Sequence, residues 1–199
     1  MAFTRSILRN ARPEIDVRQR VSFSVDDYHQ LLATGILDKD DRIELINGEL
    51  TIMPPIGPEH SSHSSELNHC LSRLVPDSMR VRMGDPITIA PHSEPQPDAA
   101  VVRVRKDNYK KAHPGPADVL LVIEVADSSA PFDNEVKSKL YGKAGIPEYW
   151  VIDIKAGRVR IFTAPSAKGY RKISENYRGD VIQCGTIPQL KLKVDDLLV

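Results

Sequence analysis

Glu124 is the residue whose surroundings most need a chemical explanation. It stands in the run from Val119 to Val125, and all the remaining residues of this run are valine, leucine or isoleucine, so the segment has no polar face. A carboxylate buried in such a strand takes up a proton unless a cation or a polar cavity compensates it. From this strand alone two explanations stay open, a structural ion pair with an arginine or lysine and a functional site.

Asp98 opens the strand-like segment that precedes the one bearing Glu124. If the two segments pair as an antiparallel hairpin, the register that sets Arg103 opposite Val119 places Asp98 beside Glu124. Two converging carboxylates without thiolates suit a hard cation, with Mg²⁺ as the physiological choice and Mn²⁺ as a substitute. For Asp98 taken alone, an ordinary turn role after Pro97 is the competing interpretation.

A lysine in the next element is the third candidate. The pattern predicts a helix over residues 134–144, with Asp133 as its N-cap and Gly145 just beyond its end. At about 100° per residue, Lys137 falls on the apolar face of this helix, whereas Lys139 points to the opposite side. A lysine on such a face commonly extends its charged end to solvent, but this one also follows directly after the strand with the unexplained carboxylate.

The elements before these residues are predicted by caps and turns. Ser24 and the residues after it have the pattern of a short capped helix. Asn47-Gly48 between two alternating runs predicts a two-residue hairpin, in which Glu44 and Glu49 share a face. An apolar stripe predicts a helix over residues 61–75.

The order of the elements indicates the fold class. The helix at residues 61–75 is followed by extended segments, by the helix at residues 134–144 and by the strand EYWVIDI. Three strand-like segments come after it, RVRIFT, YRKISE and DVIQ. This order predicts an α/β protein with a sheet of mixed direction.

Composition narrows the function classes. The 27 basic and 27 acidic residues balance, so any contact with a polyanion must be local. The two cysteines form no metal-binding or redox motif, which indicates a reducing compartment. No segment has the pattern of a signal peptide or a membrane span, so we expect a cytoplasmic protein without membrane contact.

We expect one domain over residues 23–199, after an N-terminal segment, residues 1–22, whose arginines fit either a flexible solvated tail or phosphate contacts.

The ordered set of segments resembles the PD-(D/E)xK nuclease superfamily and, within it, the Uma-type family of restriction-endonuclease-like bacterial proteins. The likeness runs from about Ser24 to the closing GTIPQLKLKVDDLL and includes RIELINGEL, MPPIGPEH, PDAAVV, LLVIEVADSS and GIPEYWVID. The resemblance implies a restriction-endonuclease-like fold, with a mixed β-sheet core, flanking helices and added β-hairpins.

The resemblance also implies roles for the three candidates. Asp98 and Glu124 would bind Mg²⁺, or Mn²⁺ in its place, with the backbone carbonyl of Val125 as a further ligand. Lys137 would position or help to activate water. In the usual superfamily motif the lysine stands two residues after the glutamate, but that position is Ala126 here, so the lysine is supplied by the following helix.

Two further residues occupy positions that the family tends to keep. His60 and Glu49 would complete the pocket or orient the attacking water. His60 and His63, three residues apart, also permit a zinc-binding interpretation, although histidines at a helix start are more often solvated or hydrogen-bonded.

The implied function is metal-dependent hydrolysis of phosphodiester bonds in DNA by an endonuclease, acting as a homodimer by analogy with enzymes that cut two strands. The rival function is a catalytically inactive nuclease-fold module that binds nucleic acid or a protein partner, which the neutral charge balance keeps open. The basic segment at 105–116, RKDNYKKAHPGP, would follow a DNA backbone or be a solvated loop, and the second interpretation is the commoner one.

Overall fold

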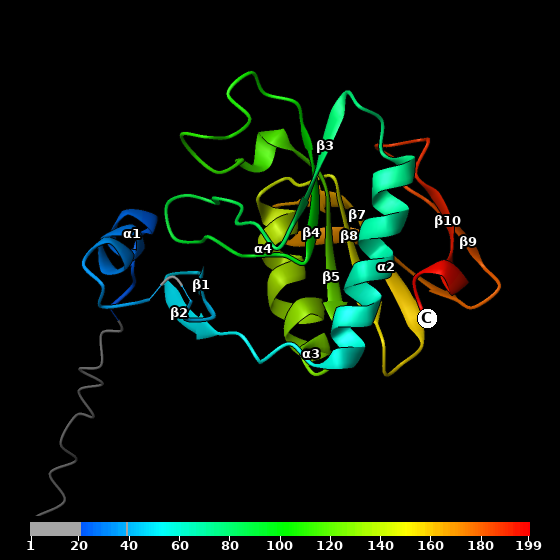
Figure 1. Ribbon diagram of the computed structural model, residues 1–199, viewed down its shortest axis with the longest axis horizontal. Helices are drawn as coiled ribbons and strands as arrows, with labels where there is room; N and C mark the ends of the chain where they lie inside the picture. The colour runs from blue at the N-terminus through cyan, green and yellow to red at the C-terminus, as the bar shows by residue number, and fades with distance from the viewer. Residues whose placement is uncertain (1–20, 39) are drawn as a thin grey trace, which may run out of the picture.

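Six strands form one twisted sheet in the order β3-β4-β5-β6-β7-β8 (Figure 1). The computed structural model describes residues 21–38 and 40–199. The β5–β6 pair is parallel and every other neighbouring pair is antiparallel, which confirms the predicted mixed sheet. The strands of this sheet are β3 Met79–Met83, β4 Ala99–Arg103, β5 Val119–Ala126, β6 Glu148–Asp153, β7 Arg158–Ser166 and β8 Gly169–Tyr177.

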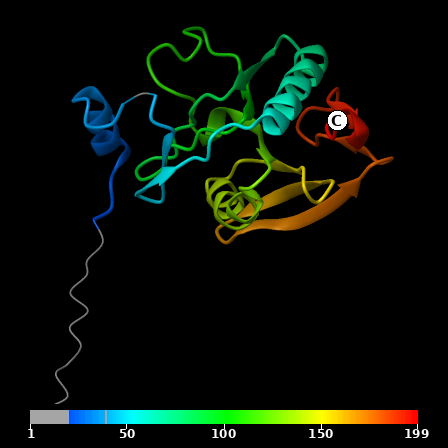
Figure 2. The same cartoon turned by 60° about the horizontal axis from the view of Figure 1, so that its bottom comes forward.

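Helices cover both faces of the sheet. The helices are α1 Val25–Ala33, α2 Pro58–Leu74, α3 Ala130–Phe132 and α4 Ser138–Lys143, with single 3₁₀ turns at Pro116–Asp118 and Val194–Asp196. A π-helical turn at Asp133–Lys137 joins α3 to α4, and we call the whole of residues 130–143 the crossover helix, because it connects the parallel strands β5 and β6. Figures 1 and 2 show α2 and the crossover helix on opposite sides of the sheet.

The two faces of the sheet carry separate apolar clusters. On one face, Leu67 and Leu71 of α2 pack with Trp150 and with the C-terminal segment that holds β9 (Val181–Gln183) and β10 (Lys191–Lys193). On the other face, Tyr141 of α4 packs with Tyr149 and its neighbours. Because both faces are covered, β5 is buried along its whole length, which explains its continuous apolar run.

A separate two-stranded hairpin lies beside one end of the sheet, together with α1 (Figure 1). Its strands are β1 Ile43–Ile46 and β2 Glu49–Ile52, and Ile46 pairs with Glu49 as predicted. Asn47 and Gly48 both have positive φ, which a two-residue hairpin of this kind requires. Ser24 and Asp27 form the predicted capping box at the start of α1.

The β4–β5 register agrees with the prediction at one end and differs at the other. Ala99 pairs with Ile123, which sets the preceding Asp98 beside Glu124 as expected. At the far end Val119 pairs with Val102 and not with Arg103, so that pairing was wrong. The reason is a bulge at Leu120, an extra residue in β5 that shifts the register by one.

Both central helices begin earlier than predicted. The α2 helix starts at Pro58 and not near residue 61, because proline suits the first helical position, and His60 therefore lies in its first turn. The crossover helix starts at Ala130, so the prediction of Asp133 as an N-cap was wrong: Asp133 lies inside the helix and is buried. The predicted end is confirmed, because Gly145 has a φ of +81°.

The basic segment at 105–116 lies at the end of β4 opposite to Asp98. Tyr109 is buried, its hydroxyl donates to the Arg103 carbonyl at 2.7 Å, and the Arg105 guanidinium lies 4.2 Å from its ring centroid. The ring therefore packs within the loop itself.

Three sequence expectations concern the chain as a whole. The N-terminal segment falls almost entirely outside the described residues, which begin at residue 21. Within the described part, no helix combines the length and apolar character needed to cross a bilayer. Cys70 and Cys184 are both free thiols.

Gly142 fixes how closely the crossover helix approaches β8, and this generates a stability prediction. A Cβ at position 142 would lie 2.6 Å from the carbonyl carbon of Gly169 and 2.7 Å from the Tyr170 nitrogen. Glycine-to-alanine changes inside helices usually stabilise, by up to about 1 kcal/mol. We expect Gly142→Ala to lower the free energy of unfolding instead, by about 1–3 kcal/mol, because backbone must move to make room.

Urea denaturation followed by circular dichroism measures this change. Lys143→Ala, at the exposed neighbouring position, is the control and should stay within about 0.5 kcal/mol of wild type. A stabilised Gly142→Ala variant would contradict the close approach.

Candidate active site

Asp98 and Glu124 meet where β4 begins beside β5. The Asp98 backbone N–H points to Glu124 Oε2 at 3.4 Å, and the Val125 backbone N–H donates to Asp98 Oδ2 at 2.7 Å. These two contacts follow from the β4–β5 register, which sets Asp98 and Glu124 side by side. The structure thus brings together the two carboxylates that the sequence singled out.

Lys137 reaches the same point from the crossover helix. Its Nζ lies 3.0 Å from Glu124 Oε1, 3.2 Å from Glu44 Oε1 and 3.8 Å from Asp133 Oδ1. The lysine is 4% exposed, so its ammonium does not extend to bulk solvent. The Tyr141 hydroxyl, one helical turn further on, donates to Glu124 Oε1 at 3.1 Å.

Two carboxylates in this cluster were not among the predicted site residues. Glu44 of β1 is buried, and its Oε2 accepts the Gln96 backbone N–H at 3.1 Å. The alternation of the hairpin put Glu44 and Glu49 on one face, which was the available signal, but it could not show which one enters the pocket. Glu49 is exposed at the start of β2 and lies outside the set of pocket-lining residues. Asp133 was overlooked because it was interpreted as a helix cap.

His60 approaches the cluster from the first turn of α2. Its Nε2 lies 3.1 Å from Asp98 Oδ1, and this hydrogen bond is the main reason that the pKa of His60 is raised. His63 has a different partner, the Glu59 backbone carbonyl at 2.8 Å from its Nδ1. Over the residues that the structure describes, no three His, Cys, Asp or Glu side chains form a ready metal cluster, so the two histidines give no support to a zinc site.

The pKa values of the cluster reflect burial and crowding of charge. Burial raises the pKa of Glu124 well above its ordinary value, while Lys137 acts in the opposite direction. Burial also raises the pKa of Asp133 to about 6, again against the effect of Lys137. Burial alone would lower the pKa of Lys137, but its carboxylate neighbours outweigh this and raise it, so the lysine stays an ammonium.

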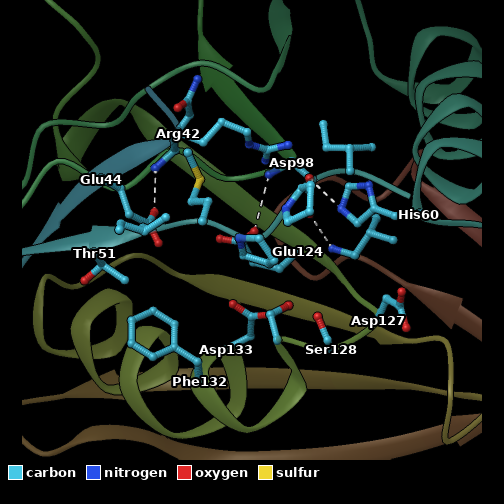
Figure 3. A pocket seen from close by; sticks show the side chains of 18 of the residues that line it. Arg42, Glu44, Thr51, His60, Asp98, Glu124, Asp127, Ser128, Phe132 and Asp133 are labelled. Atoms are coloured by element: carbon cyan, nitrogen blue, oxygen red, sulfur yellow. Dashed lines mark hydrogen bonds and ion pairs between the residues drawn. The ribbon is translucent and has the colours of Figure 1, made fainter. Parts of the chain in front are cut away.

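These side chains form the wall of a pocket of about 400 Å³ (Figure 3). It lies between the β1–β2 hairpin with the segment that follows it on one side and the start of the crossover helix on the other. The lining residues are Arg42, Glu44, Thr51, Ile52, Met53, Pro54, Pro55, Ile56, Gly57, His60, Gln96, Asp98, Glu124, Val125, Asp127, Ser128, Ser129, Phe132, Asp133 and Lys137.

The donor set suits a hard divalent cation. Glu44, Asp98, Glu124, Asp127 and Asp133 bring five carboxylates to one pocket, and Lys137 contacts three of them, Glu44, Glu124 and Asp133. Crowded carboxylates raise one another's pKa values unless a cation offsets their charge. The candidate ligands are the carboxylates of Asp98 and Glu124 and the main-chain carbonyl of Val125, and none of them is a thiolate. Such oxygen ligands are those that Mg²⁺ and Mn²⁺ prefer.

The raised pKa of Asp133 generates a prediction about pH and stability. Its ordinary value of 3.8 applies to the unfolded chain, and the folded value is about 6. The folded state therefore holds this proton more tightly, and the contribution of Asp133 to stability falls as the pH rises from about 4 to 6. Asp133→Asn has no such proton, so its stability relative to wild type should rise over this window, by up to about 3 kcal/mol, and then level off.

Urea denaturation at a series of pH values from 4 to 8, in the presence of a chelator, measures the difference. Glu135→Gln, an exposed position on the same helical turn, serves as the control and should show no comparable trend. A difference between Asp133→Asn and wild type that does not change with pH would contradict the crowding of charge described above.

Comparisons with known proteins agree with the geometry. The model of the Uma2 family, described as "putative restriction endonuclease", matches residues 25–195. A solved structure titled "putative nuclease belonging to DUF820", from Anabaena variabilis, is similar with a TM-score of 0.66 and 16% identity, over 88% of this chain and 97% of that one. At this identity the likeness concerns the fold, and it confirms the nuclease-like architecture. The comparison with curated proteins gave no match. Since the family match spans most of the chain, this protein belongs to the Uma2 family of "putative restriction endonucleases".

Proposed function

We propose that this protein is a metal-dependent endonuclease that hydrolyses phosphodiester bonds in DNA. One observation carries the proposal: Asp98 and Glu124 converge in a pocket with an excess of carboxylates, beside a buried lysine that stays charged. Family membership and the nuclease-like fold support the general class, a nuclease of the restriction-endonuclease type. Mg²⁺ as cofactor, DNA as substrate, a homodimer and a cytoplasmic location are the finer parts of the proposal.

The proposal assigns the acidic residues to cation binding. Asp98, Glu124 and the carbonyl of Val125 would hold the cation, Mg²⁺ or Mn²⁺. When bound, a divalent cation polarises a phosphate oxygen and makes a nearby water more acidic. His60 holds the Asp98 carboxylate in place, and Tyr141 does the same for Glu124.

The proposed role of Lys137 follows from its being protonated. An ammonium whose pKa is raised has no free electron pair with which to take a proton from water. It would therefore act as a fixed positive charge, which offsets the negative charge that grows on the phosphate as water attacks. Its three carboxylate contacts hold it in position for this purpose.

The rival function, a nuclease-fold module that binds without turnover, also has one observation in its favour. Glu124 Oε1 already accepts hydrogen bonds from both Lys137 and Tyr141, so this oxygen is engaged without a metal. If the contacts have a purely structural purpose, the pocket binds no divalent cation. Metal binding therefore separates the two functions.

Isothermal titration with Mn²⁺ and with Mg²⁺ tests the cation. We expect one site per wild-type chain, with an affinity weakened at least about tenfold in Asp98→Ala, because one of two carboxylate ligands is lost. Glu135→Ala, which removes an exposed carboxylate of the crossover helix, should bind like wild type. Absence of metal binding to the wild-type protein would favour the module without turnover.

Nicking of supercoiled DNA in the presence of Mg²⁺ or Mn²⁺ tests the reaction, with linear and single-stranded DNA assayed in parallel. We expect Glu124→Gln and Lys137→Ala to lower the rate about 10²–10³-fold, since each removes a charge that acts on the transition state. Lys139→Ala, two residues along the same helix and exposed, should keep the wild-type rate.

Thermal melts must accompany this assay, because Lys137→Ala leaves a buried carboxylate without its partner and costs stability. Glu124→Gln keeps the shape of the side chain and is the more informative variant. Equal nicking by wild type and all variants would indicate a contaminating nuclease and would remove the proposal.

A further inference from the structure

Arg42 is a pocket residue that the proposed chemistry does not use. It precedes β1, lines the pocket beside the carboxylate cluster, and is drawn among the side chains that face it in Figure 3. Within residues 21–38 and 40–199, its guanidinium makes no ion pair, although five carboxylates line the same pocket. A guanidinium so placed can make two parallel hydrogen bonds to a phosphate.

The other basic residues near the pocket are already engaged. Lys137 contacts three carboxylates, and Lys155 pairs with Asp127 at 2.9 Å. Among the residues that the structure describes, Arg42 and Lys137 are the two lysine or arginine residues in the pocket lining. Proteins that bind duplex DNA tightly neutralise about 6–10 phosphates. Here the basic loop that could add such contacts lies at the other end of β4.

Apolar residues form the rim of the pocket between β2 and α2. Ile56, which precedes α2, is 57% exposed and lines the pocket together with Pro54 and Pro55. Ile52 pairs with Ile43, so its side chain lies on the other face of the hairpin from Glu44 and Thr51. Exposed apolar groups gathered at the mouth of a pocket mark a place where a ligand's apolar surface is covered.

We propose that the pocket accepts one unpaired nucleotide, with its phosphate on Arg42 and its base against Ile56. This inference names the substrate class of the proposed nuclease site, a single strand or an unpaired segment, and rests on that proposed function. A base can contact the rim only if it is not stacked inside a duplex, because its faces are covered there. The volume of about 400 Å³ is at the lower end of the range for small-molecule sites, about 300–1,000 Å³, which suits a single nucleotide.

Fluorescence anisotropy with a labelled DNA oligonucleotide, in a chelator so that no cleavage occurs, tests this substrate class. The same sequence is offered as a single strand and within a blunt duplex. We expect the full-length protein to bind the single strand at least about tenfold more tightly than the duplex. We expect Arg42→Ala to weaken binding of the single strand about tenfold, or about 1.4 kcal/mol, and Arg42→Lys to lose less.

Two matched controls keep the charge and the hydrophobicity comparable. Arg103→Ala removes the same charge from the far end of β4 and should bind like wild type. Ile56→Ser should weaken binding of the single strand, whereas Ile173→Ser, at a position on β8 that is 52% exposed, should not. Thermal melts confirm that each variant is folded.

Each result has a definite meaning. Equal affinity for the duplex, equal loss in Arg42→Ala and Arg103→Ala, or no binding to either oligonucleotide would overturn the inference. Cleavage of duplex DNA as fast as of single strands would overturn it and leave the nuclease proposal standing. Arg42-dependent binding of single strands without cleavage in any metal would support this recognition mode and remove the nuclease proposal.

Discussion

The buried contact between Glu124 and Lys137 is the interaction on which the arrangement of the site depends. A strand covered on both faces has no water with which to solvate a carboxylate, and the loss of one partner from a buried ion pair costs about 3–5 kcal/mol. The crossover helix must therefore present Lys137 to β5 at this one place. Tyr141 on the next turn adds a hydrogen bond to the same oxygen, so the helix is aligned with the strand by two polar contacts.

The remaining residues of the site come from elements that meet at this contact. Glu44 comes from the hairpin, Asp98 from the start of β4, His60 from the first turn of α2, and Asp133 from the π-helical turn. This set holds more negative charge than Lys137 can balance, and burial makes the imbalance more costly. A core selected for stability alone would not gather these groups, and the proposed cation site would account for their proximity.

The proposed site draws its groups from several elements. Asp98 and Glu124 lie on adjacent strands of the sheet, whereas Glu44, Arg42 and Ile56 lie on the hairpin or beside it. Several contacts hold the hairpin to the rest of the protein, among them the Leu45 bridge to Glu94, the hydrogen bond from the Asn47 N–H to Ser93 Oγ and the ion pair between Glu44 and Lys137. The proposed chemistry and the proposed recognition of a substrate therefore both depend on the position of the hairpin.

The amino-acid sequence determined the local features of this protein. Alternation, caps and turn residues showed the hairpin at Asn47-Gly48, the capped start of α1 and the end of the crossover helix, because these depend on neighbours along the chain. Glu124 and Lys137 could be identified as candidates because each is a charged residue in an apolar pattern, where a charge needs a partner. Tertiary structure alone decided the rest. It placed Glu44 and not Glu49 in the pocket, buried Asp133, and left the Arg42 guanidinium without an ion pair among the described residues. These outcomes depend on how separate elements pack together in space and have no periodicity along the chain.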